Sequence, residues 1–447
     1  MRPKLLASAI KLSTAIAFTA ALGPAHGADL LNLYRDALVS DPVFQAARAQ
    51  RSATIEKLPQ ARAGYLPFVS ATAAVFRNNN QRDGTEDLDY TTRGATVALS
   101  QPIFRLPNWI AIGQAENIVI QADARLIDAG QELIVRTAVA YFDVLLAQDT
   151  VAFSGAQKEA FTQQLAQAKR NFEVGTATIV DTLEAQARYD QTVAKEILDQ
   201  NDLEVKRRAL QQLVGKVVDG LVPLREGLQL ALPNPNDIEA WVNAAQESSL
   251  AIISAKAFAE AARQEVDRVR AGHLPTLDLS ANYNYNRNPA STLGQLVTGV
   301  SATSRDTQVG IVLGVPLFEG GLTQSRVREA VALRDKAVQD LETAQRGVAQ
   351  SVRQNFLFVT NGISGVQALE RALASTQSQL ESTILGRDVG VRTSVDVLNA
   401  QQQVFQTRRD LQQVRYGYLL NTLRLKAAAG RLSEPDLEQI NRMLGRG

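Results

Sequence analysis

The residue types that carry most enzyme chemistry are scarce in this chain of 447 residues. It contains no cysteine, which excludes thiol catalysis, disulfide bonds and cysteine zinc sites. Its two histidines, His26 and His273, are too few for a histidine metal cluster. No Gly-x-x-x-x-Gly-Lys loop is present to hold a phosphate group. The composition therefore predicts a protein that is not an enzyme and that uses no metal or cofactor.

Two aspartates stand out because the sequence around them occurs twice. Asp181 and Asp396 each follow a Val-Gly pair at the same spacing, and the glycines are Gly175 and Gly390. Glycine is the common residue just beyond a helix end, and the helix dipole favours an acid in the first turn of the next helix. The pattern predicts two sharp helix reversals, each followed by a helix with an acid near its start.

Long blocks without proline must position these reversals. One block lies between Pro107 and Pro223, and the other between Pro316 and Pro435. Proline costs a helix interior about 3 kcal/mol, and both blocks are rich in Ala, Gln, Leu, Arg and Glu with heptad-like apolar series. We expect very long paired helices, although an ordinary soluble coiled coil would show the same features.

Before each block, apolar and polar residues alternate with the period of β-strands. The pattern is clearest over residues 277–286 and 309–317, and weaker over 69–75 and 95–103. Four strands of roughly 10–12 residues would suit the tilted strands of an outer-membrane barrel. A pair of soluble hairpins with one buried face would alternate in the same way.

The chain is duplicated internally. Arg62-Ala63-Gly64-Tyr65-Leu66-Pro67 returns as Arg270-Ala271-Gly272-His273-Leu274-Pro275, and the motifs around Gly175 and Asp181 return around Gly390 and Asp396. We expect a first repeat at 28–236 and a second at 237–447. The first is predicted to hold strands at about 65–78 and 90–103, a long helix at about 105–171, a turn at about 174–177 and a return helix at about 179–214. The second is predicted to hold strands at about 275–288 and 305–318, a long helix at about 321–386, a turn at about 389–392 and a return helix at about 394–429.

Residues 1–27 have the three parts of a secretory signal peptide: a positive start, an apolar stretch and small residues before a cleavage site. The formal charge of the chain is +1, and Arg2, Lys4 and Lys11 are all in this leader. The remainder is close to neutral, which argues against nucleic acid as a partner. We expect a mature chain that is periplasmic, extracellular or embedded as strands.

Four strands cannot close a barrel by themselves, and an open sheet edge in lipid leaves backbone groups unpaired. Two chains would supply eight strands, which enclose only side chains. Three chains are the smallest assembly with a useful pore, and four chains would also close.

The sequence resembles the TolC family of outer-membrane channel-tunnels over essentially the whole chain after the leader. The likeness rests on the duplicated Arg-Ala-Gly-x-Leu-Pro motif, on Pro316-Leu317-Phe318-Glu319-Gly320-Gly321, and on the paired turn motifs 174–181 and 389–396. The resemblance implies a mainly α fold with a membrane β part: a homotrimer with a shared 12-stranded β-barrel, continued by a 12-helix periplasmic α-barrel. It also implies a place in the outer membrane of a Gram-negative bacterium, in contact with lipid. The implied partners are a periplasmic adaptor and an inner-membrane ABC or proton-driven transporter.

The resemblance also implies a periplasmic gate at the reversals. By position, Asp396 matches an acidic ring residue, Arg392 a constricting arginine, and Asp181 a partner in the links that hold the gate closed. The chain departs from the family at Asn399, where a second acidic ring residue is expected, and at Arg387, which replaces a tyrosine of the gate. We therefore expect a weaker acidic ring and different constraining bonds.

The implied function is export of proteins or small toxic compounds in type I secretion or multidrug efflux. The competing hypothesis is a soluble periplasmic scaffold of helical hairpins, such as a transporter adaptor. Adaptors have one hairpin beside compact β-domains, whereas here the hairpin and the strands occur twice.

Overall fold

The computed structural model describes residues 28–445 apart from 81–87, 219, 226–229 and 289–301. The expected leader, residues 1–27, lies outside the described residues, as does most of each loop between paired strands. No helix within the described ranges combines the length and the apolar composition that a bilayer span requires.

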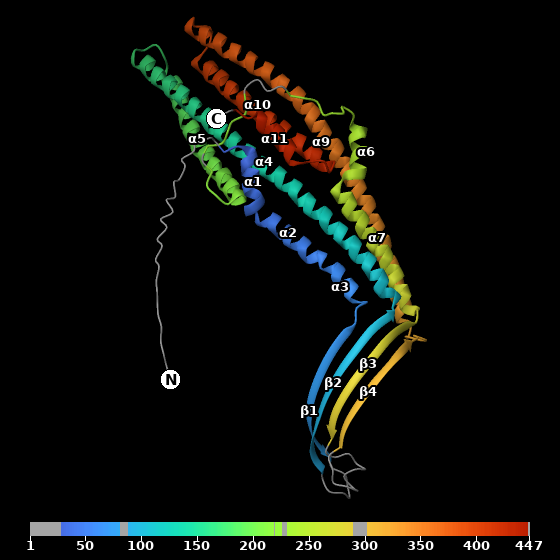
Figure 1. The fold of residues 1–447 in the computed structure, drawn as a ribbon. Coiled ribbons are helices and arrows are strands. Elements are labelled where there is room, and N and C mark those ends of the chain that lie inside the picture. The colour runs from blue at the N-terminus through green and yellow to red at the C-terminus, as the bar shows by residue number, and fades with distance from the viewer. Residues whose placement is uncertain (1–27, 81–87, 219, 226–229, 289–301, 446–447) are drawn as a thin grey trace, which may run out of the picture.

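Both halves of the chain follow the same order of elements. The first half contains α1 (Leu30–Ser40), α2 (Pro42–Ile55), α3 (Lys57–Ala63), β1 (Phe68–Asn80), β2 (Leu88–Phe104), α4 (Leu106–Glu173) and α5 (Ile179–Val214). The second half contains α6 (Ile238–Ser248), α7 (Leu250–Arg270), the short 3₁₀ turn η1 (Ala271–His273), β3 (Thr276–Asn288), β4 (Ala302–Gly314), α9 (Leu322–Asp388), α10 (Ser394–Ala428) and α11 (Glu434–Met443). The sheet lies at one end of the elongated molecule and both helix reversals lie at the other (Figure 1).

The long helices have the lengths that the proline-free blocks predict. α4 has 68 residues and α9 has 67, so each extends about 100 Å at 1.5 Å per residue. Each is paired along its far part with its return helix, α4 with α5 and α9 with α10, and α7 packs between α4 and α9 nearer the sheet. The return helix α10 and the helix α7 thus lie along successive parts of the long helix α9.

The strands form one antiparallel sheet in the order β1-β2-β3-β4. The central β2–β3 pair joins the two halves, with Val97 opposite Tyr283 and Thr96 opposite Asn284. The side chain of Thr96 donates to that of Asn284 over 2.9 Å. Polar and apolar residues therefore separate onto opposite faces of the sheet, as period-two alternation requires.

The fourth strand is shifted toward the N-terminus from its predicted span of about 305–318, because it begins at Ala302 and ends at Gly314. Gly314 pairs with Thr276, the first residue of β3, so nothing lies opposite the residues that follow. Pro316 also lacks the N–H that a ladder would need. Leu317 and Phe318 instead lie in the connection to α9, 92% and 89% exposed.

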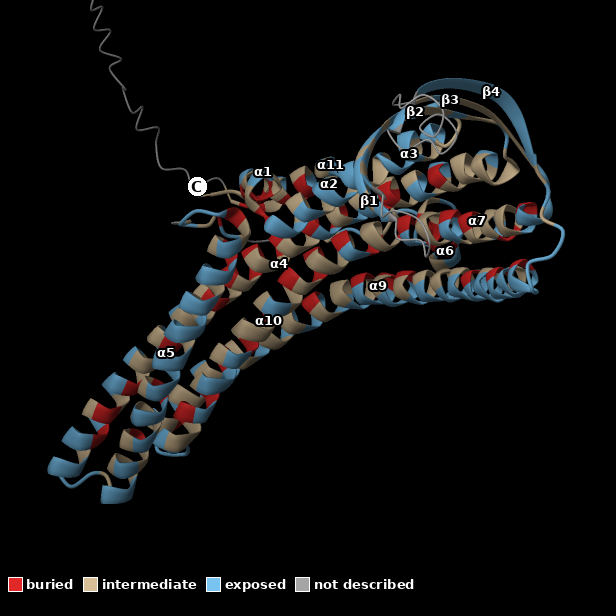
Figure 2. Ribbon diagram, turned by 90° about the horizontal axis from the view of Figure 1, so that it is seen from below, coloured by how far each residue is buried: buried red, intermediate tan, exposed pale blue. Residues whose placement is uncertain are grey.

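One hydrophobic core joins the two halves near the middle of the helical part. It is formed by α1, α4, the end of α5, α6, α9, α10 and α11, and Figure 2 shows that buried residues are sparse toward the hairpin ends and in the sheet. Phe142 of α4 stacks on Tyr416 of α10 with ring centroids 5.4 Å apart. The Tyr416 hydroxyl donates to Asp149 over 2.8 Å, and the Tyr141 hydroxyl donates to the carbonyl of Val222 over 2.7 Å. The core therefore fixes the point from which both hairpins project.

Candidate functional site at the helix reversals

Each long helix reverses through a short turn that contains a glycine in the left-handed region. Gly175 has φ +80° and Gly390 has φ +81°, a conformation that glycine adopts without the steric cost of a Cβ atom. In both turns one carbonyl, of Asn171 or of Gly386, accepts the backbone N–H groups of the residues five and six positions later. The backbone geometry of the two predicted reversals is therefore nearly the same.

The two aspartates close capping boxes at the start of the return helices. Asp181 accepts from the backbone N–H of Thr178 over 2.9 Å and from its hydroxyl over 2.7 Å. Asp396 accepts from the same groups of Thr393 over 2.9 Å each. These donors hold the pKa of both carboxyl groups below the ordinary value, with the hydroxyl the larger influence on Asp181 and the backbone N–H the larger on Asp396. Both carboxylates are ionised at neutral pH.

Three of the predicted site residues line one groove. Arg392, Asp396 and Asn399 lie with polar residues of α9 along the groove between α9 and α10. The Arg392 charge further lowers the pKa of Asp396. This groove therefore presents one carboxylate, one guanidinium and several amides close together.

Asp181 and Arg387 lie elsewhere, in a small cavity between the two hairpins. Arg387 is ion-paired with Asp388, the next residue, with 2.8 Å between guanidinium nitrogen and carboxylate oxygen. No described hydrogen bond or ion pair joins Asp181 to Arg387. The five predicted residues thus form two adjacent groups rather than one cluster.

The hairpins are linked by polar side chains that the sequence did not single out. Arg188 of α5 donates to Asn399 over 3.3 Å and to Gln402 over 3.5 Å, and Gln164 of α4 donates to Gln401 over 3.0 Å. Arginine and glutamine are frequent on the outer faces of these helices. Only the packing of α4 and α5 against α10 reveals which of them make contact.

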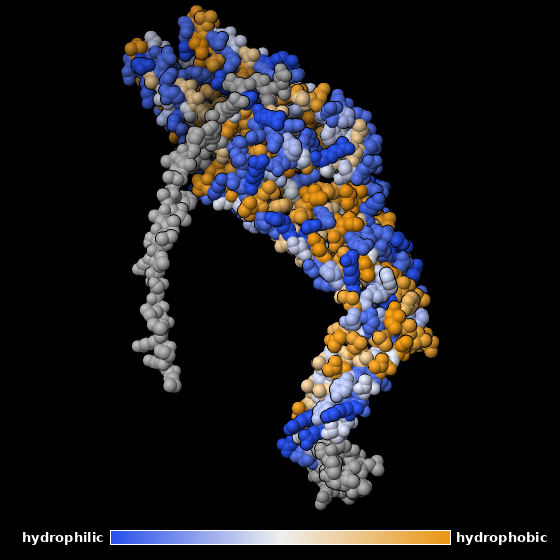
Figure 3. All heavy atoms as spheres, in the orientation of Figure 1, coloured by the Kyte–Doolittle hydropathy of each residue, from blue (hydrophilic) through white to orange (hydrophobic). Residues whose placement is uncertain are grey.

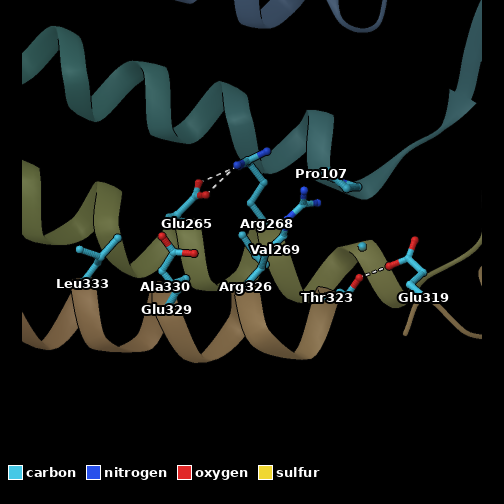
Figure 4. A pocket seen from close by; sticks show the side chains of 11 residues that line it. Pro107, Glu265, Arg268, Val269, Glu319, Thr323, Arg326, Glu329, Ala330 and Leu333 are labelled. Atoms are coloured by element: carbon cyan, nitrogen blue, oxygen red, sulfur yellow. Dashed lines mark hydrogen bonds and ion pairs between the residues drawn. The ribbon is translucent and has the colours of Figure 1, made fainter. Parts of the chain in front are cut away.

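A cavity of about 430 Å³ lies where α4, α7 and α9 meet the sheet (Figure 4). Its carboxylates and cations include Glu265 and Arg268, which form a bidentate pair at 2.6 and 2.7 Å. The Arg268 guanidinium holds the pKa of Glu265 below its usual range. Glu319 is hydrogen-bonded to Thr323. Because these charged and polar groups already have hydrogen-bond partners, they suit a structural role at the junction better than a catalytic one. The described residues include no group of three or more potential metal ligands.

Comparison with known proteins supports the architecture along the whole chain. The family model of outer membrane efflux proteins matches residues 33–216 and 241–431, one segment in each half. The outer membrane protein TolC of Vibrio cholerae is 35% identical over 431 residues, which cover 95% of this chain and 96% of that protein. The alkaline protease secretion protein AprF of Pseudomonas aeruginosa is 31% identical over 420 residues, which cover 92% and 86% of the two chains. The crystal structure of the Campylobacter jejuni CmeC outer membrane channel superimposes with a TM-score of 0.78 at 14% identity, over 99% of this chain and 98% of that chain.

The fold and its relatives define an outer-membrane channel of the efflux or secretion class, with its helical part in the periplasm. The protein is a transport component and not an enzyme. The chain belongs to the outer membrane efflux protein family and is a TolC homologue. This assignment replaces the alternative of a soluble periplasmic scaffold or adaptor.

Proposed function

We propose that three copies of the chain share one 12-stranded barrel in the outer membrane, which continues into a 12-helix periplasmic tunnel. The observation that carries this proposal is the open sheet: β1 and β4 are each paired along one edge only in the described structure. An unpaired strand edge cannot remain in lipid, so β4 of one copy must pair with β1 of the next. Three such sheets supply twelve strands, enough to enclose a channel.

Exposed apolar residues support contact between the sheet and outer-membrane lipid. Figure 3 shows hydrophobic residues gathered on the visible face around the junction of sheet and helices, with hydrophilic residues toward the far ends of the strands. Val69, Val309, Ile311 and Leu313 lie on one face of the sheet and are each more than 60% exposed in the single chain. Patches of this kind mark membrane or protein contacts.

The mass of the protein extracted from the outer membrane in mild detergent tests the assembly. Three copies are expected, and a stable monomer would overturn the proposal. A disulfide test sharpens it, because the chain has no cysteine of its own. β1 and β4 are separated by two strands, roughly 14 Å at the usual strand spacing, which is beyond the reach of a disulfide within one chain.

Four double variants are therefore made, each with Ala73→Cys in β1 and one cysteine in β4. The β4 cysteine replaces Arg305, Thr307, Val309 or Ile311, which lie on the same face of the sheet as Ala73. At least one combination is expected to yield covalent dimers and trimers. The control pair Ala73→Cys and Ala95→Cys, which are opposite in the β1–β2 ladder, should close within one chain. Failure of all four combinations, with the control closing, would exclude a β1–β4 interface.

The reversals are proposed to form the periplasmic gate of this channel. Asp396, Arg392 and Asn399 would face the axis, while Asp181 and Arg387 would act where the two hairpins meet. The capping donors keep Asp396 ionised, and three ionised carboxylates around a narrow axis would concentrate cations. An amide at Asn399 in place of a second acid would weaken that effect.

We assign the channel to export, with a periplasmic adaptor and an inner-membrane ABC or proton-driven transporter as its partners. The named function of AprF, alkaline protease secretion, supports protein cargo, and the efflux family supports small toxic compounds. A deletion strain assayed for secreted proteins and for drug susceptibility distinguishes them. Loss of secretion alone assigns protein cargo, loss of resistance alone assigns small molecules, and no change in either would overturn the export role.

A further inference from the structure

A second groove in the helical wall has a composition unlike that of the reversals. It lies between α4, α7 and α9 on their periplasmic part and has a volume of about 700 Å³, within the range of small-molecule pockets. Figure 3 shows hydrophobic residues gathered over the middle of the helical part, where α4 and α7 run side by side. The groove is thus a candidate binding site outside the proposed gate.

The floor of the groove is aliphatic. Ile120 of α4 and Val338 of α9 are 49% and 47% exposed, and Ile253 of α7 and Leu341 of α9 complete the floor. α4, α7 and α9 are successive neighbours in one wall, so all four side chains come from a single chain. Water in contact with this surface would be released by an apolar ligand.

The charges that line the groove are mostly positive. Lys256, Arg263 and Arg334 are cations, and Glu260 is the one acid of the described lining. Arg263 is paired with Glu260 at 2.6 Å and with Asp267 at 3.4 Å, and Arg334 is paired with Asp335 at 2.6 Å. Lys256 has no ion pair or hydrogen bond among the described side chains and is exposed. An unpaired ammonium group therefore stands beside an aliphatic floor.

We propose that this groove binds small amphipathic organic anions, with the apolar body on Ile120, Ile253, Val338 and Leu341 and the acidic group on Lys256. A neutral apolar molecule would leave Lys256 without a partner, and an organic cation would be repelled by Lys256, the one cation of the described lining that has no acidic partner. The chemistry of the lining thus selects the sign of the ligand as well as its apolar character.

The test measures binding of naphthalene-2-sulfonate to the purified full-length protein in a neutral maltoside detergent, by equilibrium dialysis against protein-free micelles. The matched cation, naphthalen-2-ylmethylammonium, is measured in parallel. The wild type is expected to bind the sulfonate and not the ammonium. Lys256→Gln should weaken sulfonate binding about tenfold, as loss of a charge-assisted contact would, and Lys256→Glu should reverse the preference.

Two control variants separate the groove from general effects of charge and hydrophobicity. Lys336→Gln removes an exposed α9 lysine that is paired with Asp340 and lies outside the groove lining, so binding should not change. Ile120→Ser should weaken binding, whereas Ile127→Ser, which removes an exposed isoleucine one heptad along the same helix, should not. Three outcomes would each overturn the proposal. They are equal binding of the two probes, equal effects of the two isoleucine variants, and no effect of Lys256→Glu, which would follow if another copy of the chain covered the site.

Discussion

The two halves of the chain have nearly the same backbone at their hairpin turns but different side chains against it. In the first turn Asn171 supplies the carbonyl that accepts two N–H groups, and Ala177 is one of the donors. In the second turn the equivalent positions are Gly386 and Arg392. A Cβ atom at Gly386 would lie 2.8 Å from Cγ of Arg392. The larger residue on one side of the turn is therefore accommodated by a smaller residue on the other.

The other ends of the return helices show the same principle. Gly215 and Gly430 both have positive φ, +74° and +68°. A Cβ atom on Gly215 would lie 2.8 Å from the Cβ of Ser40, whereas on Gly430 it would lie 2.1 Å from the backbone carbonyl oxygen of Ser248. The two halves therefore share the turn geometry, but the atoms packed against each glycine differ. Those atoms decide how well a larger residue is tolerated at that position.

The largest expected effect is at Gly430. Gly430→Ala combines the cost of a left-handed non-glycine residue, roughly 1–2 kcal/mol, with a backbone clash of roughly 1–3 kcal/mol. Gly215→Ala meets only a serine side chain and should cost less. Thermal unfolding of the purified variants, followed by circular dichroism, measures both. Equal losses of stability would show that the contact with Ser248 does not distinguish the halves.

The next effect tests the pairing of Gly386 with Arg392. Gly386→Ala should destabilise the second hairpin by about 1–3 kcal/mol through overpacking. In an Arg392→Ala background the same substitution should cost much less, because the clashing side chain is gone. A double-mutant cycle on thermal stability gives the coupling, and additive effects would contradict the proposed contact.

Arg392 also distinguishes the two turns in the proposed gate, since Ala177 is its counterpart. Arg392→Ala removes a fixed cation and hydrogen-bond donor from the groove that also holds Asp396, so single-channel conductance in planar bilayers should rise. Arg188→Gln, which removes a link between the hairpins, should raise it less. An Arg392→Ala channel with wild-type conductance would place the constriction elsewhere.

Ion selectivity separates the two aspartates. Asp396→Asn should lower the preference for cations measured from reversal potentials, because Asp396 lines the α9–α10 groove. Asp181→Asn is the matched variant: it alters an equivalent capping box, but its side chain lies between the hairpins. The same shift in both variants would argue against a specific ring of Asp396 carboxylates.

The smallest effect is the pH dependence of the caps. The pKa values of Asp181 and Asp396 are lowered in the folded protein, so their contribution is complete above the ordinary value of 3.8 and is lost as pH falls through the folded pKa. Thr178→Ala removes the cap of the first return helix and should cost about 1 kcal/mol. Hydrogen exchange in the first turn of α5 should therefore accelerate below pH 4 in the wild type and at neutral pH in Thr178→Ala.

The sequence by itself determined the helices and the positions of their reversals. α5 begins at Ile179 and ends at Val214, as the pattern of glycines and caps predicts, because these signals act within a few residues of the helix end. The strand boundaries were less well determined. β4 ends at Gly314 rather than 318, since the end of a strand depends on where its partner begins.

Only the tertiary structure decided which side chains meet. The sequence placed five candidate residues at the reversals, but the packing of α10 against α4 divided them between the α9–α10 groove and the cavity between hairpins. The contacts of Arg188 and the apolar, basic groove beside Lys256 also join residues that are far apart in the sequence. Local propensity fixes where helices begin and end, whereas the burial of apolar surface between them fixes which of their faces touch.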